Sequence, residues 1–183
     1  MLALKGRRPG FSLLELLLVL AIATLLLGVA APSFRSVIEG QQLRVAAADL
    51  LAAINLARSQ AIARGRTVLL ASSGDDWAQG WQIFIDRNAN QRRDAGEALL
   101  ARHDPLPQGL RGESKFSSPA SPPYIAYNMA GRGCAATNSQ AARWGTLTLE
   151  LGGQRRRIVI NMLGRARLCD PLGEPAACGA AAP

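Results

Sequence analysis

The first 65 residues carry the pattern of one long helix whose two halves differ in character. From Phe11 to Ala31 every residue except Glu15 is uncharged. At 1.5 Å of rise per residue this run is roughly 31 Å long, enough to cross the hydrocarbon core of a bilayer. From residue 33 to residue 64 apolar residues instead recur at helical i, i+3 and i+4 spacings. The pattern predicts a helix with an apolar first half and an amphipathic second half, ended by Gly65.

After Thr67 the pattern changes to short strand-like runs separated by turn residues. The predicted strands are 67–71, 80–86, 97–102, 123–128, 145–151 and 156–161. In 145–151 leucines alternate with polar residues, which is typical of an antiparallel sheet with one solvent-facing side. Gly152-Gly153 predicts a hairpin to the next strand, whereas 103–122 predicts a long connection. The expected fold is α+β, with a long N-terminal helix packed on an antiparallel β-sheet head.

Charged residues at the N-terminus indicate how the helix is oriented in a membrane, and one of them, Glu15, needs an explanation. Lys5, Arg7 and Arg8 precede the apolar run, so the positive-inside rule places the N-terminus in the cytoplasm. A carboxylate such as Glu15 inside a membrane helix costs about 2.5 to 3.5 kcal/mol on insertion scales, so it calls for a functional reason. The overall net charge of +8 favours anionic partners or serves solubility.

An ordinary secretory signal is one alternative for this N-terminus. Residues 28–34, GVAAPSF, offer a small-residue cleavage site after the apolar run. A cleaved signal would give no reason for Glu15, however, and would not explain why the helical pattern continues past Pro32.

The run Gly10-Phe11-Ser12-Leu13-Leu14-Glu15, followed by the apolar segment, resembles the class III signal of type IV pilins and type II secretion pseudopilins. The resemblance implies that a prepilin peptidase cuts between Gly10 and Phe11 and methylates Phe11. The new α-amine, with a pKa near 8, would then pair with Glu15 of a neighbouring subunit in a filament. Such pairing offsets the desolvation of both charges and makes Glu15 an assembly residue.

The head resembles the GspH/FimT group of pseudopilins and minor pilins more specifically. The resemblance rests on Trp81 to Asp86, on residues 127–131 and on the ending INMLGRARLC. It implies a minor subunit that starts or caps a type II secretion pseudopilus or a type IV pilus. Its partners would be the inner membrane, the prepilin peptidase and other pilins, with a single membrane pass and a periplasmic head that ends in a filament or at the cell surface.

The expected organisation has five parts. These are a cytoplasmic leader (1–10), the transmembrane half of the helix (11–31), its amphipathic periplasmic half (32–65), the β-rich head (66–169) and a disordered tail (170–183).

Arginines gather near the C-terminal end of the head. Gly164-Arg165-Ala166-Arg167 resembles the GRxR signature of FimT-type minor pilins, which is linked to DNA capture in natural transformation. We therefore expect Arg165 and Arg167, joined by Arg156, to contact DNA phosphates. Two alternatives are a charged edge strand that resists aggregation and a docking face for an acidic neighbour.

The three cysteines allow one disulfide in an exported head. We expect Cys134 to pair with Cys169 in preference to Cys169 with Cys178, because the residues after Cys169 have the composition of a disordered tail.

Other candidate chemistry is sparse. Asp86, Asn88, Asn90, Asp94 and Glu97 follow EF-hand spacing, but Gln91 stands where that loop needs glycine, and strand-like runs flank it. We therefore interpret 86–97 as a polar hairpin tip and predict no metal and no cofactor. The single histidine, His103, lies beside Asp104 at a predicted strand end or loop, and Ser72-Ser73 lacks the context of a nucleophile elbow. No catalytic set is therefore visible, and no enzyme is predicted.

Overall fold

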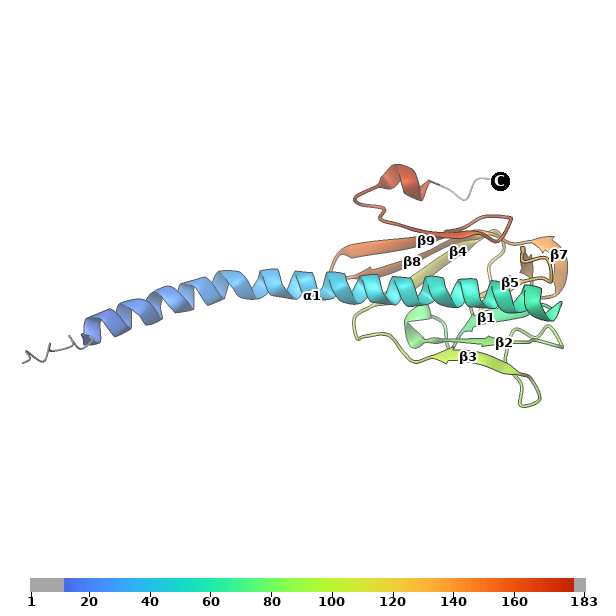
Figure 1. Ribbon diagram of the computed structural model, residues 1–183, viewed down its shortest axis with the longest axis horizontal. Coiled ribbons are helices and arrows are strands. Elements are labelled where there is room, and N and C mark those ends of the chain that lie inside the picture. Colours follow the sequence, from blue (N-terminus) through green and yellow to red (C-terminus); the bar gives the residue numbers. More distant parts are fainter. Residues whose placement is uncertain (1–11, 180–183) are drawn as a thin grey trace, which may run out of the picture. The chain divides into compact units, whose positions relative to one another are not determined.

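The structure, a computed structural model, describes residues 12–179, without the side chains of residues 29–33 (Figure 1). The chain divides into two units, residues 1–38 and residues 39–183. The first contains the beginning of helix α1 (Leu13–Arg64), and the second contains the rest of that helix and the strands.

Local hydrogen bonds fix both ends of α1. The backbone N–H of Glu15 donates to Ser12 Oγ, so Ser12 caps the helix at its N-terminus. At the other end Gly65 has a φ of +59°, and the backbone N–H of Arg66 donates to the carbonyl of Ala61. This is a glycine-terminated helix end of the kind that the sequence predicts at Gly65.

The second half of α1 buries one face in the head. The face is a stripe of leucine, isoleucine and alanine at helical spacing. Its buried apolar members are Leu43, Ala46, Ala47, Leu50, Ala53, Ile54, Ala57 and Ala61. Val45 belongs to the apolar pattern but is 56% exposed, because it lies on the opposite side of the helix.

The strands form two antiparallel sheets. The six-stranded sheet has the order β3-β2-β1-β5-β6-β7, and the four-stranded sheet has the order β10-β9-β8-β4. The first comprises β1 (Val68–Ser72), β2 (Trp81–Phe84), β3 (Leu99–His103), β5 (Tyr124–Tyr127), β6 (Gly133–Ala135) and β7 (Asn138–Ala142). The second comprises β4 (Arg111–Phe116), β8 (Gly145–Leu151), β9 (Gln154–Ile160) and β10 (Ala166–Cys169). The short 3₁₀ helices are η1 (Trp77–Gln79) and η2 (Pro175–Cys178).

One core joins α1 to the inner faces of both sheets, and Figure 1 shows the helix running alongside their strands. In β8, Leu147, Leu149 and Leu151 are buried whereas the residues between them are half-exposed, as the alternation predicts. The helix residues of this core belong to the same buried cluster as strand residues such as Leu70 and Ile158. The predicted α+β fold, a long helix packed on antiparallel strands, is confirmed.

All six predicted strands form, and four more were not predicted. Strand β4 falls inside 103–122, so the prediction of a long connection there is wrong. The remaining three are β6, β7 and β10. Gly152 and Gly153, with φ of +56° and +79°, close the predicted hairpin between β8 and β9.

The C-terminal segment is ordered as far as it is described, so the prediction of a disordered tail is wrong for residues 170–179. Cys169 forms a disulfide with Cys178, and Cys134 is buried as a free thiol. The predicted Cys134–Cys169 bond is therefore also wrong. Cys134 lies in β6 of one sheet, whereas Cys169 ends β10 of the other. The disulfide packs the tail over Val159 on the outer side of β9.

Candidate functional site

The start of α1 presents apolar side chains to solvent. Leu13 and Leu14 are 78% and 77% exposed, and Leu25 is still 72% exposed. Glu15, in the first turn, is the only charged residue between positions 12 and 28, and it too is exposed. Among the described residues nothing covers these apolar side chains, so the surface they form is suited to a membrane or to other helices.

Two N-terminal predictions cannot be placed in the structure. The expected cleavage and methylation positions, Gly10 and Phe11, lie outside the described residues. Within the described part of the chain, no helix combines the length and apolarity needed to cross a membrane.

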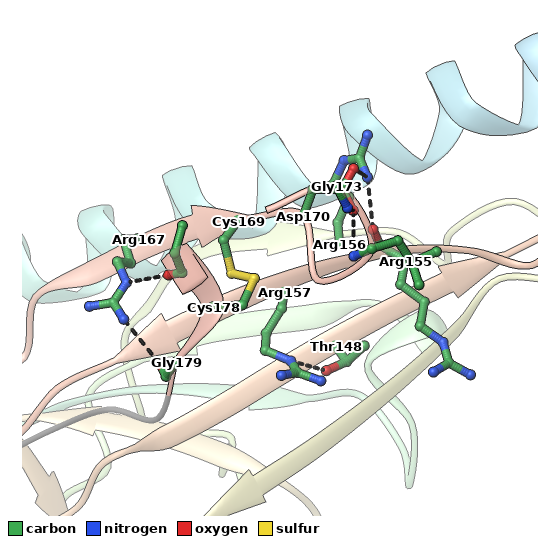
Figure 2. The surroundings of a disulfide bond; sticks show 12 residues. Thr148, Arg155, Arg156, Arg157, Arg167, Cys169, Asp170, Gly173, Cys178 and Gly179 are labelled. Carbon is green, nitrogen blue, oxygen red and sulfur yellow. Dashed lines mark hydrogen bonds and ion pairs between the residues drawn. A yellow bond between two sulfur atoms is a disulfide. The ribbon is translucent and has the colours of Figure 1, made fainter. Parts of the chain in front are cut away.

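The sheet register decides which arginines share a face. Arg155 and Arg157 lie opposite Glu150 and Thr148, on the outer face of the four-stranded sheet. Arg167 pairs with Val159, which is two residues from Arg157 and therefore on the same face. The structure thus gathers Arg155, Arg157 and Arg167 on one surface (Figure 2).

Arg156 does not belong to this surface. It lies opposite Leu149, which is buried in the core, and its guanidinium binds the carboxylate of Asp170. Backbone N–H groups of Gly173 and Leu172, together with Arg156, hold the pKa of Asp170 below its ordinary value. The structure therefore does not bring Arg156 together with Arg165 and Arg167, because side chains alternate along β9.

The side chains of Arg155, Arg165 and Arg167 differ in the hydrogen bonds and ion pairs that they make. Arg167 donates to the carbonyls of Ala177 and Gly179, so it fastens the tail (Figure 2). Arg155 pairs with Glu150 at 3.0 Å. Arg165 is exposed, and its side chain has no hydrogen bond or ion pair within residues 12–179.

The loop with calcium-like spacing uses its carboxylates internally. Glu97 is 7% exposed and accepts hydrogen bonds from the backbone N–H groups of Arg87 and Asp94. The carboxylate of Asp94 accepts from the side-chain amides of Asn88 and Asn90. These oxygens organise the turn between β2 and β3, and no cluster suited to a metal occurs among the described residues.

His103 has a packing role. Its ring stacks on Trp81 with the centroids 4.1 Å apart, and its Nε2 lies 3.7 Å from Asp49 Oδ2 on α1. It therefore connects strand β3 to the helix.

Comparison with known proteins supplies the family. Residues 46–164 match the model of the type II transport protein GspH, and residues 5–31 match the prokaryotic N-terminal methylation motif. The chain belongs to the GspH family. The match covers the second half of α1 and the strands up to the Gly164 turn, which are the parts that build the head.

Relatives of this GspH-family chain include pilins. It is 38% identical over 165 residues to the pilin-like protein PilA1 of Thermus thermophilus, covering 88% of this chain and 98% of that one. The resemblance to the GspH/FimT group of pilins and pseudopilins is thus confirmed. These are filament proteins, which agrees with the expectation of a structural subunit and not an enzyme.

Solved structures show the same fold at low identity. The minor pilin FimU of Pseudomonas aeruginosa aligns with a TM-score of 0.53 at 21% identity, covering 72% of this chain and 90% of its own. The minor pseudopilin EpsH of Vibrio cholerae aligns with a TM-score of 0.52 at 16% identity, covering 71% and 98% respectively.

Sequence reasoning missed Arg143, a buried cation in this GspH-family head. Its guanidinium lies between the rings of Phe116 and Tyr124, 4.3 Å and 4.2 Å from their centroids. It donates to the carbonyls of Ser118 and Tyr124. No local pattern marks it, because its partners come from segments far apart in the chain.

Proposed function

We propose that this chain is a minor subunit of a type II secretion pseudopilus or a type IV pilus, placed at its tip or its point of initiation. The first half of α1 would anchor it in the inner membrane with the N-terminus in the cytoplasm and the head in the periplasm. The main support for this proposal is that the first turns of α1 expose leucines around a single carboxylate, that of Glu15. The names of FimU as a minor pilin and EpsH as a minor pseudopilin support the minor role.

Assembly would depend on an ion pair between subunits. Cleavage between Gly10 and Phe11 would create an α-amine whose ordinary pKa is near 8, so most of it is cationic at neutral pH. The carboxylate of Glu15 in a neighbouring subunit would pair with it away from water. Removing one partner of a buried pair costs about 3 to 5 kcal/mol, because the other charge is left uncompensated.

The Glu15→Ala variant tests this pairing. We expect it to insert into the membrane as the parent does, because losing a charge favours insertion. We expect its incorporation into filaments to fall at least about a hundredfold, which is the population effect of about 3 kcal/mol. Immunoblots of sheared filaments and of membrane fractions measure the two steps.

The Glu15→Asp variant is the matched control, since it keeps the carboxylate. It should incorporate better than Glu15→Ala while giving the same membrane signal. Normal incorporation of Glu15→Ala would reject the ion pair as the basis of assembly. A mature N-terminus other than Phe11, read by mass spectrometry, would reject the cleavage site.

A second candidate function is DNA binding by the head, as in a FimT-like subunit for DNA uptake. The observation that favours it is Arg165, exposed and unpaired among the described residues, beside the face that carries Arg157 and Arg167. Guanidinium groups bind phosphates through paired N–H donors, with little sequence preference.

A gel shift with the full chain in non-ionic detergent tests DNA binding. We expect Arg165→Ala plus Arg167→Ala to lower affinity at least tenfold and to reduce the slope of log K against log salt by about two. Arg165→Ala by itself should give about half that change in slope, and it leaves the tail contacts of Arg167 in place.

Arg64→Ala plus Arg66→Ala removes the same charge from the end of α1 and serves as the control. Equal loss in this control would show that binding follows net charge only. DNA affinity of the Arg165→Ala, Arg167→Ala variant equal to that of the parent would exclude the site.

A further inference from the structure

A cleft opens on the face of the six-stranded sheet that α1 does not cover. Its volume is about 400 Å³. Its floor contains Ala71 and Phe84, which belong to a small apolar cluster separate from the core that holds the helix. Ser73, Gly74 and Asp75 line one wall, Gln91, Arg92 and Arg93 line another, and Ser121-Pro122 completes it.

The arginine wall comes from the loop with calcium-like spacing. Among the described residues none of its carboxylates forms an ion pair with its arginines. Asp94 and Glu97 instead accept hydrogen bonds from amide groups of the same loop. Arg92 and Arg93 are exposed, and within residues 12–179 neither guanidinium has a hydrogen bond or an ion pair. Two arginines without an ion-pair partner among the described residues therefore border the cleft.

The backbone at this wall is held in an unusual conformation. Ala89 and Gln91 have φ of +59° and +65°, a region that residues with a side chain seldom adopt. The N–H of Gln91 donates to Asp86 Oδ2, which keeps the turn in place. Arg92 and Arg93 directly follow this turn.

We propose that this cleft binds a carboxylate side chain presented by an acidic segment of a partner protein. Paired guanidinium N–H groups match the two oxygens of a carboxylate. Ser73 and Gln82 add a hydroxyl and an amide to the lining of the cleft. Asp75 lines the same cleft, so a monoanion is favoured over a phosphate dianion, which it would repel more strongly.

Proton–nitrogen correlation NMR of the full chain in non-ionic detergent tests the proposal. The probes are the N-acetylated, C-amidated peptide Gly-Ala-Glu-Ala-Gly and the same blocked peptide with Gln or phosphoserine at the centre. The Glu peptide should shift the amide signals of Ser73, Gly74 and Arg92 saturably and should bind more tightly than either other peptide. Arg92→Gln plus Arg93→Gln should weaken binding of the Glu peptide about tenfold, since each lost guanidinium removes charge-assisted hydrogen bonds to the carboxylate.

Arg87→Gln is the matched control, because Arg87 is exposed in the same loop but does not line the cleft. It should change affinity less than about twofold. Equal weakening by Arg87→Gln, tighter binding of the phosphoserine peptide, or no shifts at millimolar Glu peptide would each overturn the proposal. The test needs no filament and no DNA, so its failure leaves both earlier proposals standing.

Discussion

At the scale of single residues, Arg143 shows how a cation can be part of a protein interior. It is 4% exposed, and burial lowers the pKa of its guanidinium because the charged form loses hydration. Hydrogen bonds to the carbonyl and hydroxyl of Ser118 and to the carbonyl of Tyr124 replace part of that hydration. The rings of Phe116 and Tyr124 add cation–π attraction. Arg143 thereby joins β4, β5 and the segment between them.

We expect Arg143→Ala to lower the free energy of unfolding by about 3 kcal/mol, because it leaves buried carbonyls without donors and opens a cavity between two rings. Arg143→Lys should lower the free energy of unfolding by a smaller amount, because lysine keeps the positive charge. It should still destabilise the head, because lysine lacks the planar guanidinium. Urea denaturation followed by tryptophan fluorescence measures both.

Arg132→Ala is the control for Arg143→Ala, since Arg132 is exposed nearby. It should change stability by no more than about 0.5 kcal/mol. An Arg143→Ala midpoint equal to that of the parent would show that the buried guanidinium contributes nothing.

The cysteines show what residue spacing cannot reveal. Burial raises the pKa of the Cys134 thiol to about 11, which matches a thiol enclosed in the small apolar cluster of the six-stranded sheet. The sequence indicates that one disulfide is possible, but the choice of partner depends on which sheet each strand joins. That assignment is a long-range property, and the expected Cys134–Cys169 pair fails for this reason.

At the scale of elements, the sequence predicts those whose burial is periodic. The alternation in β8 and the helical spacing along α1 both follow from one face being buried. Strand β7 is exposed at all five residues, and β4 buries only Gly112. Neither has an apolar alternation to detect, because edge strands gain their order from backbone pairing with a neighbour.

How well each candidate site could be predicted likewise depends on whether its pattern is local in the sequence. Glu15 is conspicuous because it interrupts a long apolar run, a contrast that needs no tertiary information. The cleft beside Arg92 and Arg93 joins three loops, and the register that separates Arg156 from Arg167 requires the pairing of β9 with β10. Such features appear only once strands are placed in sheets.

At the scale of the whole molecule, the two units differ in how they are stabilised. The three buried apolar clusters of the described residues contain no residue before Leu43. Leu43, Leu50 and Ile54 are each no more than 1% exposed, whereas Phe34 and Val37 are 68% and 65% exposed. The hydrophobic stabilisation of the head therefore comes entirely from residues within the second unit.

It follows that residues 39–183 should fold without the first 38. We expect this fragment to unfold cooperatively in urea, with the near-ultraviolet circular dichroism of packed aromatic residues, because the deletion removes nothing from the buried clusters.

A fragment that begins at residue 48 is the control. It lacks Leu43, Ala46 and Ala47, and losing a buried leucine by itself costs about 2 to 5 kcal/mol, a large part of the 5 to 15 kcal/mol that is typical of a domain. The longer fragment should therefore show a sharp transition and the shorter one a broad or absent transition. If the 39–183 fragment lacks a cooperative transition while the full chain has one, the start of α1 contributes to the stability of the head and the division into independent units is wrong.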